Sequence, residues 1–294
     1  MSEISRHREL GLSDDDVRRM YRLLLTARAV DERAFILAHQ GRVNFTVGCQ
    51  GHEAAQVGAA WALRPGLDWV LPYYRDTGVM LTLGVTPYEL FLGEFAKADD
   101  PNSGGRQMPK HWSNPKLRVV TSSSVVATHL PHAVGCALAA RIAGEDAVAW
   151  ASFGDGASSK GDFHEALSFA GIHRLPVIFF CENNGYAISV PFEKQSPVPN
   201  VADRAAAYGF PGVIVDGNDA LTVYEATHEA LQRARRGDGP TLIEAKTYRL
   251  CPHTSTDDDR RYRSREEVDK WRGQDPLLRF ARYLQAEDLL GDAD

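Results

Sequence analysis

The sequence predicts an α/β fold, with a mostly parallel sheet and helices on both faces. Two apolar runs rich in β-forming residues, 148–153 and 177–181, are each followed by a polar turn, and a helix-like segment separates them. Buried parallel strands have continuous apolar runs of this kind, and helices form the crossovers between them. The alternation of strand-like and helix-like segments continues to residue 247, which is the pattern of a sheet covered on both faces.

The predicted elements follow one another along the chain. A long helix is expected from Asp14 to Gln40, because Ser13 is a favourable N-cap, carboxylates fill the first turn and Gly41 ends the segment. A chain of 294 residues with 44% hydrophobic content can bury a full core, so we expect one large domain. Further helices are expected at 53–63, 87–96, 131–143, 160–173 and 221–236, and further strands at 213–215 and 241–247.

Composition excludes several classes of partner. The net charge of −6 and the absence of a basic cluster argue against nucleic acid as a partner. No apolar run approaches the length that spans a membrane, and the N-terminus has no hydrophobic signal region. The four scattered cysteines form no CxxC pair, which suits a reducing compartment. We therefore expect a cytoplasmic protein that contacts neither nucleic acid nor a membrane.

Asp155 and Asn184 are predicted to hold a divalent metal ion. They stand 29 residues apart, about the length of one strand-helix-strand unit, so both would lie at neighbouring strand ends. Ligands bind at that edge of an open α/β sheet. Magnesium prefers oxygen ligands and completes its shell with waters and phosphates, so these two side chains suit a magnesium diphosphate. Gly154 and Gly156 permit a tight turn and close backbone approach.

Other interpretations of this motif fit the residues less well. The turn that begins at Gly154 lacks the third glycine of the dinucleotide fingerprint, and Asp162 stands where a P-loop needs lysine. An ordinary strand-loop-helix turn explains Gly-Asp-Gly alone, but not the paired Asn-Asn-Gly at this distance. A magnesium-dependent phosphohydrolase that uses Asp155 would need a second acidic cluster near the loop, and none is clear.

Residues 153–156 and 183–189 resemble the thiamin diphosphate motif in the alpha subunits of 2-oxo acid dehydrogenase decarboxylase components. The resemblance extends from about residue 15 to 280 and implies the thiamin diphosphate-binding fold over a single domain, 1–294. In that domain 1–14 is an N-terminal extension and 250–265 is the active-site loop. Further segments match in the family's order, namely 41–54, 74–76, 105–109, 248–249 and 252–258.

The resemblance also assigns roles to individual residues. His253 matches the active-site histidine, which reaches the diphosphate and the reacting centre. An arginine in the family's Tyr-Arg pair can clamp phosphate oxygens, and Ser124 and Val126 match the lining of the aminopyrimidine pocket. The implied magnesium ligands are Asp155, Asn184 and Tyr186. The implied cofactor-binding residues are Tyr74, Arg75, Ser124, Val126, Gly154, Gly156, Ala157 and His253.

The implied activity is oxidative decarboxylation of a small branched-chain 2-oxo acid, with transfer of the acyl group to a lipoyl carrier. Residues 106–112 match the branched-chain enzymes better than the pyruvate enzymes. The implied partners are a beta subunit in an α2β2 heterotetramer, which supplies the glutamate that activates the cofactor, and a lipoyl-bearing acyltransferase component. A pyruvate or acetoin dehydrogenase alpha subunit is an alternative. A catalytically silent assembly paralogue is another, although the intact Asp155, Asn184, Arg75 and His253 argue against it.

Three positions depart from the animal branched-chain enzymes. Glu182 replaces an arginine near the diphosphate, so we expect one lost positive contact and a larger share of neutralisation by Arg75, His253 and the metal ion. His129 replaces a glutamine in the family's potassium-binding loop, so the resemblance alone does not decide whether this chain has a potassium site. Thr254 stands at a regulated phosphoserine, which puts the same regulation in doubt.

Overall fold

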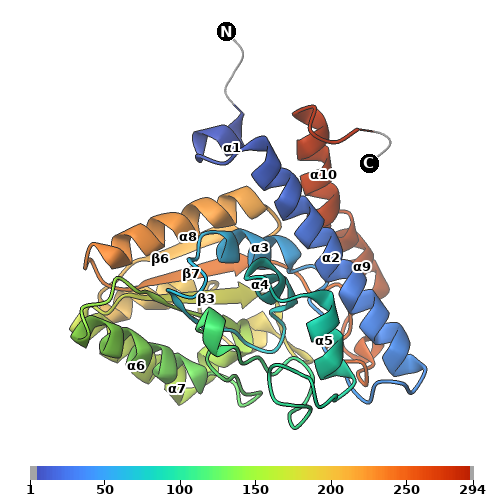
Figure 1. The fold of residues 1–294 in the computed structure, drawn as a ribbon, viewed down its shortest axis with the longest axis horizontal. Coiled ribbons are helices and arrows are strands. Elements are labelled where there is room, and N and C mark those ends of the chain that lie inside the picture. Colours follow the sequence, from blue (N-terminus) through green and yellow to red (C-terminus); the bar gives the residue numbers. More distant parts are fainter. Residues whose placement is uncertain (1–4, 292–294) are drawn as a thin grey trace.

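The computed structural model describes residues 5–291, and a five-stranded parallel sheet forms its centre (Figure 1). The strand order β1-β2-β3-β7-β6 confirms the predicted α/β fold with a mostly parallel sheet. A separate two-stranded antiparallel pair, β4 and β5, follows β3. The strands are β1 (Trp69–Leu71), β2 (Ala149–Gly154), β3 (Val177–Asn183), β4 (Tyr186–Ala187), β5 (Val190–Pro191), β6 (Gly212–Asp216) and β7 (Thr241–Lys246).

Helices cover both faces of the sheet, as Figure 1 shows. One face packs against α6 (His129–Ile142) and α7 (Gly161–His173). The other packs against α3 (Glu53–Trp61), α4 (Thr77–Thr82) and α8 (Ala220–Arg235). Within residues 5–291, no helix has both the length and the apolar character needed to cross a membrane.

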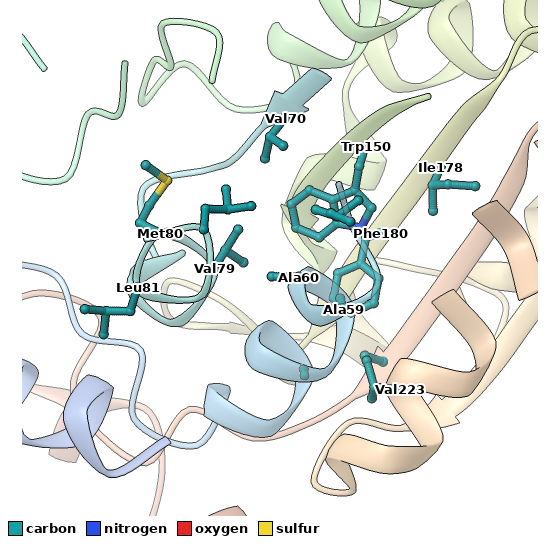
Figure 2. Close-up of a cluster of buried hydrophobic side chains, with 14 of the residues drawn as sticks. Ala59, Ala60, Val70, Val79, Met80, Leu81, Trp150, Ile178, Phe180 and Val223 are labelled. Carbon is teal, nitrogen blue, oxygen red and sulfur yellow. The ribbon is translucent and has the colours of Figure 1, made fainter. Parts of the chain in front are cut away.

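The central strands are apolar throughout because both of their faces are buried. Trp150, Ile178 and Phe180 belong to the cluster under α3, α4 and α8, where Figure 2 shows them with Val79 of α4. Their neighbours along the strands, such as Phe179, belong to the cluster under α6 and α7. Successive residues of a strand point to opposite faces, so a sheet covered on both sides needs an unbroken apolar run.

The long helix α2 (Asp14–His39) begins and ends as the sequence predicts. The Ser13 hydroxyl accepts the backbone N–H of Asp16 at 3.2 Å, and the Asp16 carboxylate accepts the backbone N–H of Ser13 at 2.9 Å. This reciprocal capping box satisfies two donors of the first turn. Gly41, which adopts φ +68°, follows its C-terminus. Part of the predicted extension before residue 14 forms the short helix α1 (Arg6–Glu9), while residues 1–4 lie outside the described range.

Four α-helices of the described residues were not predicted: α1, α4, α9 (Arg265–Arg272) and α10 (Pro276–Ala286). The α10 residues Leu277, Phe280 and Leu284 pack into a cluster with the first half of α2. The apolar positions of α10 recur at helical spacing, so this signal was present in the sequence. The predicted helix at 87–96 is α5 (Pro87–Glu94), and α6 starts two residues before the predicted position.

Candidate functional site

A cavity of about 370 Å³ lies at the edge of the sheet where β1, β2, β3 and β7 end. Carboxyl ends of neighbouring parallel strands meet at one edge, which is where ligands bind in such folds. All the residues that the sequence analysis named as site residues line this one cavity. They are Tyr74, Arg75, Ser124, Val126, Gly154, Asp155, Gly156, Ala157, Asn184, Tyr186 and His253.

Asp155 presents a free carboxylate oxygen at the wall of the cavity. The residue is 1% exposed, and its Oδ2 accepts a hydrogen bond from the Gln195 amide at 3.1 Å. Its Oδ1 is buried and has no partner among the described residues. Burial raises the pKa of this carboxyl to about 6. A buried anionic oxygen without a donor fits a bound cation, which would replace the water that the carboxylate has lost.

Asn184 directly follows β3 and Tyr186 begins β4, and both line the cavity together with Asp155. The Asn184 side-chain oxygen accepts the backbone N–H of Tyr186 at 3.2 Å and retains a second lone pair. The Tyr186 hydroxyl donates to Glu267 of α9 at 2.9 Å. Because its phenol is engaged there, only the backbone carbonyl of Tyr186 is available to a metal ion. Gly185, with φ +83°, makes the turn between them.

The described residues contain no cluster of three or more histidine, cysteine, aspartate or glutamate side chains arranged for a metal ion. A closed cage made only of protein ligands is therefore absent from residues 5–291. The residues expected to hold the metal ion would supply one carboxylate, one amide oxygen and one backbone carbonyl. Magnesium is commonly held by such a partial set and completed by waters and phosphate oxygens.

Of the two glycines of the motif, only one lies where an added Cβ would clash with a neighbouring residue. Gly154 adopts φ −80°, and a Cβ added there would meet nothing closer than 3.9 Å, so the expected tight-turn role is wrong for this residue. A Cβ on Gly156 would lie 2.7 Å from the Cβ of Ala187. Only Gly156 is therefore needed for the close backbone approach, which brings the turn after β2 against β4.

Arg75 and Arg249 are two buried cations that share this cavity. Neither forms an ion pair with a carboxylate within residues 5–291, and both are almost fully buried. Arg75 donates to the carbonyl of Gly48, and Arg249 donates to the carbonyl of Ile188 at 2.8 Å. Adjacent buried guanidinium groups repel each other, and neither contacts a carboxylate within residues 5–291, so the arrangement favours an anion that both can contact.

Arg249 lies in segment 248–249, which matches the family's order, but it is not among the residues predicted for the site. Its position offered a usable signal: a Tyr-Arg pair follows β7 at 248–249, as the Tyr-Arg pair at 74–75 follows β1. Both arginines then occupy the same edge of a parallel sheet. His111 and His129 are further polar residues that line the cavity and were not named as site residues.

His253 lies between the two arginines. Its Nδ1 is 3.2 Å from the Arg75 guanidinium and 3.4 Å from that of Arg249. Arginine only donates, so Nδ1 accepts and the proton of the neutral ring is on Nε2. Burial, Arg75 and Arg249 lower the pKa of His253 to about 3. An anion bound between the arginines would cancel part of that charge and raise the pKa again.

The loop 250–265 is tied down by contacts at several points. The Asp257 carboxylate accepts the backbone N–H of His253 at 2.8 Å and the hydroxyl of Tyr262. Arg249 is linked to Asp257 through Tyr262, whose hydroxyl accepts a hydrogen bond from Arg249 at 2.9 Å. Ser255 and Thr46 exchange two hydrogen bonds of 3.0 Å, which join the loop to the segment before α3.

Glu182 does not line the cavity, and the expected loss of one positive contact to the diphosphate at this position stays a prediction. It is fully buried and accepts hydrogen bonds from the Tyr73 hydroxyl at 2.9 Å and the Gln56 amide at 3.0 Å. His129 does line the cavity, and its Nε2–H donates to the carbonyl of Ser152 at 2.6 Å. Thr254 lies at the cavity beside His253 and is partly exposed.

The family described as "Dehydrogenase E1 component" matches residues 21–294. This chain belongs to that family. The match covers every element from the middle of α2 onward, including all the strand ends that surround the cavity.

Relatives of this E1 component chain are found in several bacteria. It is 56% identical over 288 residues to the 2-oxoisovalerate dehydrogenase subunit alpha of Bacillus subtilis, covering 98% of this chain and 87% of the relative. It is 44% identical over 283 residues to the 3-methyl-2-oxobutanoate dehydrogenase subunit alpha of Mycobacterium tuberculosis, covering 96% and 74%. The pyruvate dehydrogenase E1 component subunit alpha of Bacillus subtilis is 39% identical over 284 residues, covering 96% and 74%.

Proposed function

We propose that this chain is the alpha subunit of a branched-chain 2-oxo acid dehydrogenase, which decarboxylates 3-methyl-2-oxobutanoate and passes the acyl group to a lipoyl carrier. One observation carries the proposal. A single cavity collects, from the ends of four strands, an unpartnered buried carboxylate oxygen and two buried arginines without carboxylate partners. That combination suits a diphosphate bridged to the protein by a divalent cation.

The E1 family depends on thiamin diphosphate, and the cavity residues fit its magnesium-bound form. The Asp155 carboxylate, the Asn184 amide oxygen and the Tyr186 carbonyl would hold the ion. Arg75 and Arg249 would bind the phosphate oxygens, and Ser124 and Val126 would line the aminopyrimidine side. When bound, thiamin diphosphate supplies a carbon centre that acts as the electron sink for decarboxylation.

The chain's own residues then orient the reactants and exclude water. His253 is fixed by hydrogen bonds to both arginines and by its backbone contact to Asp257. Its Nε2–H is the proton that it can offer to a substrate or carrier group. Full transfer of that proton requires the ring to carry a second proton at Nδ1, which an anion bound between the two arginines would favour. Histidine in such a position commonly serves general acid-base catalysis.

A beta subunit partner completes this site in our proposal. Asp155 is the one carboxylate among the described residues that line the cavity, and its position suits the metal ion, so no cavity-lining residue serves as the activating glutamate. The cavity also has exposed apolar lining at Met108, Val126 and Ile188. Exposed apolar surface beside a ligand cavity favours closure by another subunit. An α2β2 heterotetramer that docks a lipoyl-bearing acyltransferase component follows from this arrangement.

The branched-chain substrate is supported by a comparison within one organism. The chain is 56% identical to the 2-oxoisovalerate dehydrogenase subunit of Bacillus subtilis and 39% identical to the pyruvate dehydrogenase subunit of the same bacterium. Both relatives come from the same bacterium, so the difference in identity favours the branched-chain activity over the pyruvate activity. The intact Asp155, Asn184, Arg75 and His253 argue against a silent assembly paralogue.

The decisive experiment compares 3-methyl-2-oxobutanoate, pyruvate and acetoin in steady-state assays of this chain with its beta subunit. We expect the highest kcat/KM with 3-methyl-2-oxobutanoate. The chain alone should be nearly inactive in decarboxylation with an artificial electron acceptor, and the beta subunit should restore turnover. Full activity of the isolated chain would contradict the divided site, and a preference for pyruvate or acetoin would contradict the branched-chain assignment.

A further inference from the structure

A lysine and an aspartate form a buried ion pair outside the cavity. Lys110 Nζ lies 2.7 Å from Asp31 Oδ1 of α2, and neither side chain is more than 3% exposed. Glu94, at the end of α5, is a second buried carboxylate, 3.9 Å from the same ammonium group. Burial disfavours the charge of Lys110, but Asp31 and Glu94 outweigh it and raise the pKa of Lys110 above its ordinary value. The lysine is therefore a buried cation.

The backbone of Lys110 adopts a conformation that lysine rarely takes. Its φ of +62° is in the left-handed region, which suits glycine and is strained for a residue with a Cβ. Strain of this kind persists only where surrounding contacts compensate for it. The ammonium group donates to the carbonyl of Val47 as well as to Asp31. These contacts hold Lys110 in place and join it to the segment 46–49, which runs between α2 and α3.

Asp31 and Arg75 contact opposite ends of one peptide group in this segment. The second carboxylate oxygen of Asp31, Oδ2, accepts the backbone N–H of Cys49. The carbonyl of Gly48, which belongs to the same peptide unit, accepts a hydrogen bond from the Arg75 guanidinium. A trans peptide unit is rigid and planar, with its N–H and C=O on opposite sides. The direction of the Gly48 carbonyl therefore follows from the position of Asp31.

We propose that Asp31 and Lys110 are positioning residues for Arg75, acting through this shared peptide group. Lys110 fixes the carboxylate, the carboxylate fixes the peptide group, and the carbonyl of that group orients the guanidinium. The guanidinium in turn contacts His253 Nδ1 at 3.2 Å. The inference rests on the proposed function for the ligand that Arg75 binds. The contacts that place Arg75 do not depend on that ligand.

Gly48 permits the close approach that this arrangement needs. A Cβ added to Gly48 would lie 2.8 Å from Cys251 Sγ and 3.0 Å from Asp31 Oδ2. Protein interiors are close-packed, so a side chain at this position would push the peptide group away from its neighbours. Val47, the residue before it, lines the cavity. The segment is thus packed tightly between the ion pair and the cavity, and it has little freedom to move independently of Asp31.

Titration calorimetry with thiamin diphosphate and magnesium tests the role, using this chain assembled with its beta subunit. Asp31→Leu removes the acceptor of the Cys49 N–H and should weaken binding at least about tenfold, the size expected for one hydrogen bond of a charged group. Asp31→Asn should stay within about threefold of the parent, because its amide oxygen still accepts that N–H. In both variants Glu94 remains as a carboxylate beside Lys110.

Glu94→Leu is the matched control. It removes a buried carboxylate from the same cluster but leaves the Lys110–Asp31 pair and its bond to the peptide group in place. Denaturant unfolding should show a loss of stability, because the Thr46 hydroxyl loses the carboxylate that it contacts at 2.9 Å. Thiamin diphosphate binding should nevertheless stay within about threefold of the parent.

Lys110→Met tests the lysine separately and takes the place of Asp31→Leu if that variant does not fold. Asp31 would become a buried anion without its closest cation, and the Val47 carbonyl would lose its donor, so binding should weaken at least about tenfold. Adding Asp31→Asn to Lys110→Met removes the unpaired charge and keeps the acceptor for Cys49. The double variant should therefore recover affinity to within about threefold of the parent.

Crystal structures of the cofactor-free assemblies measure the position of Arg75 directly. The guanidinium should leave the Gly48 carbonyl in Asp31→Leu and keep that contact in Asp31→Asn and Glu94→Leu. An Arg75 that does not move in Asp31→Leu would overturn the inference. If the parent binds no thiamin diphosphate, the proposed function fails, while the crystal structures still decide whether Asp31 positions Arg75.

The calorimetry has its own contrary outcomes. An Asp31→Asn variant that binds as weakly as Asp31→Leu would show that the hydrogen bond to the peptide group is not what matters. A Glu94→Leu variant that binds as weakly would show that the cluster acts through general stability. An unchanged affinity in Lys110→Met would overturn the role of the lysine.

Discussion

The guanidinium of Arg75 lies 3.2 Å from Nδ1 of His253, although 178 positions separate the two residues. The contact joins the turn after β1 to the loop after β7 across the cavity. It fixes the tautomer of the histidine, with its proton on Nε2, and holds the ring neutral.

Asp155→Ala should abolish tight binding of thiamin diphosphate in magnesium. Without the carboxylate the ion loses its anionic ligand, and the diphosphate would face the turn without charge compensation. Titration calorimetry measures the affinity directly. Asp203→Ala is a matched control, because it removes the same group from an exposed position in the described chain. An unchanged affinity in Asp155→Ala would rule out the magnesium bridge.

Cofactor affinity should fall as the pH is lowered below about 6, the pKa of Asp155 in the absence of a metal ion. A metal ligand must be deprotonated, so binding of the magnesium form has to displace the proton that Asp155 holds under acidic conditions. Affinity should drop by about tenfold per pH unit below that pKa and stay level above it. Calorimetry over a pH series checks this, and a profile that is flat through pH 6 would contradict the assignment.

Arg249→Gln should weaken thiamin diphosphate binding by about 10- to 100-fold, because a hydrogen bond to a charged group contributes about 1.5–3 kcal/mol. Glutamine keeps a donor but removes the charge. The same substitution should raise the pKa of His253, since Arg249 is one of the charges that lower it. Tyr262→Phe separates the two roles, because it breaks the link from Arg249 to the loop and leaves the charge in place. If Arg249→Gln and Tyr262→Phe lose the same amount of thiamin diphosphate affinity, Arg249 acts only through its link to the loop.

His253→Ala should impair acyl transfer to the lipoyl domain more than cofactor binding. Loss of a general acid-base group typically lowers the rate by about 10²–10⁴-fold, whereas a lost phosphate contact is overcome by excess cofactor. The assays are reductive acylation of the lipoyl domain at saturating thiamin diphosphate and decarboxylation with an artificial acceptor. If both rates stay within about threefold of the parent, far below that range, His253 has no catalytic role.

Gly156→Ala should destabilise the chain by about 1–3 kcal/mol, the usual effect of overpacking. The added methyl group would lie 2.7 Å from the Cβ of Ala187, and relief of that clash would move the turn that carries Asp155. Gly161→Ala is the control, because nothing lies within 4 Å of its added Cβ. Denaturant unfolding measures both variants. Equal free energies of unfolding for Gly156→Ala and Gly161→Ala would show that the turn accommodates the added methyl group without strain.

Local patterns were enough to predict the scaffold. Apolar runs identify β2 and β3 because both faces of a covered parallel sheet are buried, and the capping residue Ser13 locates the start of α2. The spacing of Asp155 and Asn184 predicts their neighbourhood because parallel strands linked by one helix end at the same edge. Such inferences succeed because they depend on residues close in sequence.

The contacts between distant segments were decided only by the tertiary structure. Glu182 is on the same face of β3 as Phe180, so strand alternation turns it toward Gln56 of α3 and away from the cavity. Asp257 accepts a hydrogen bond from Tyr262, and Arg249 joins Arg75 beside His253. The sequence by itself determined which residues stand at strand ends. Which of them touch depends on sheet order and on the burial of each charge, and both arise only when the whole chain packs.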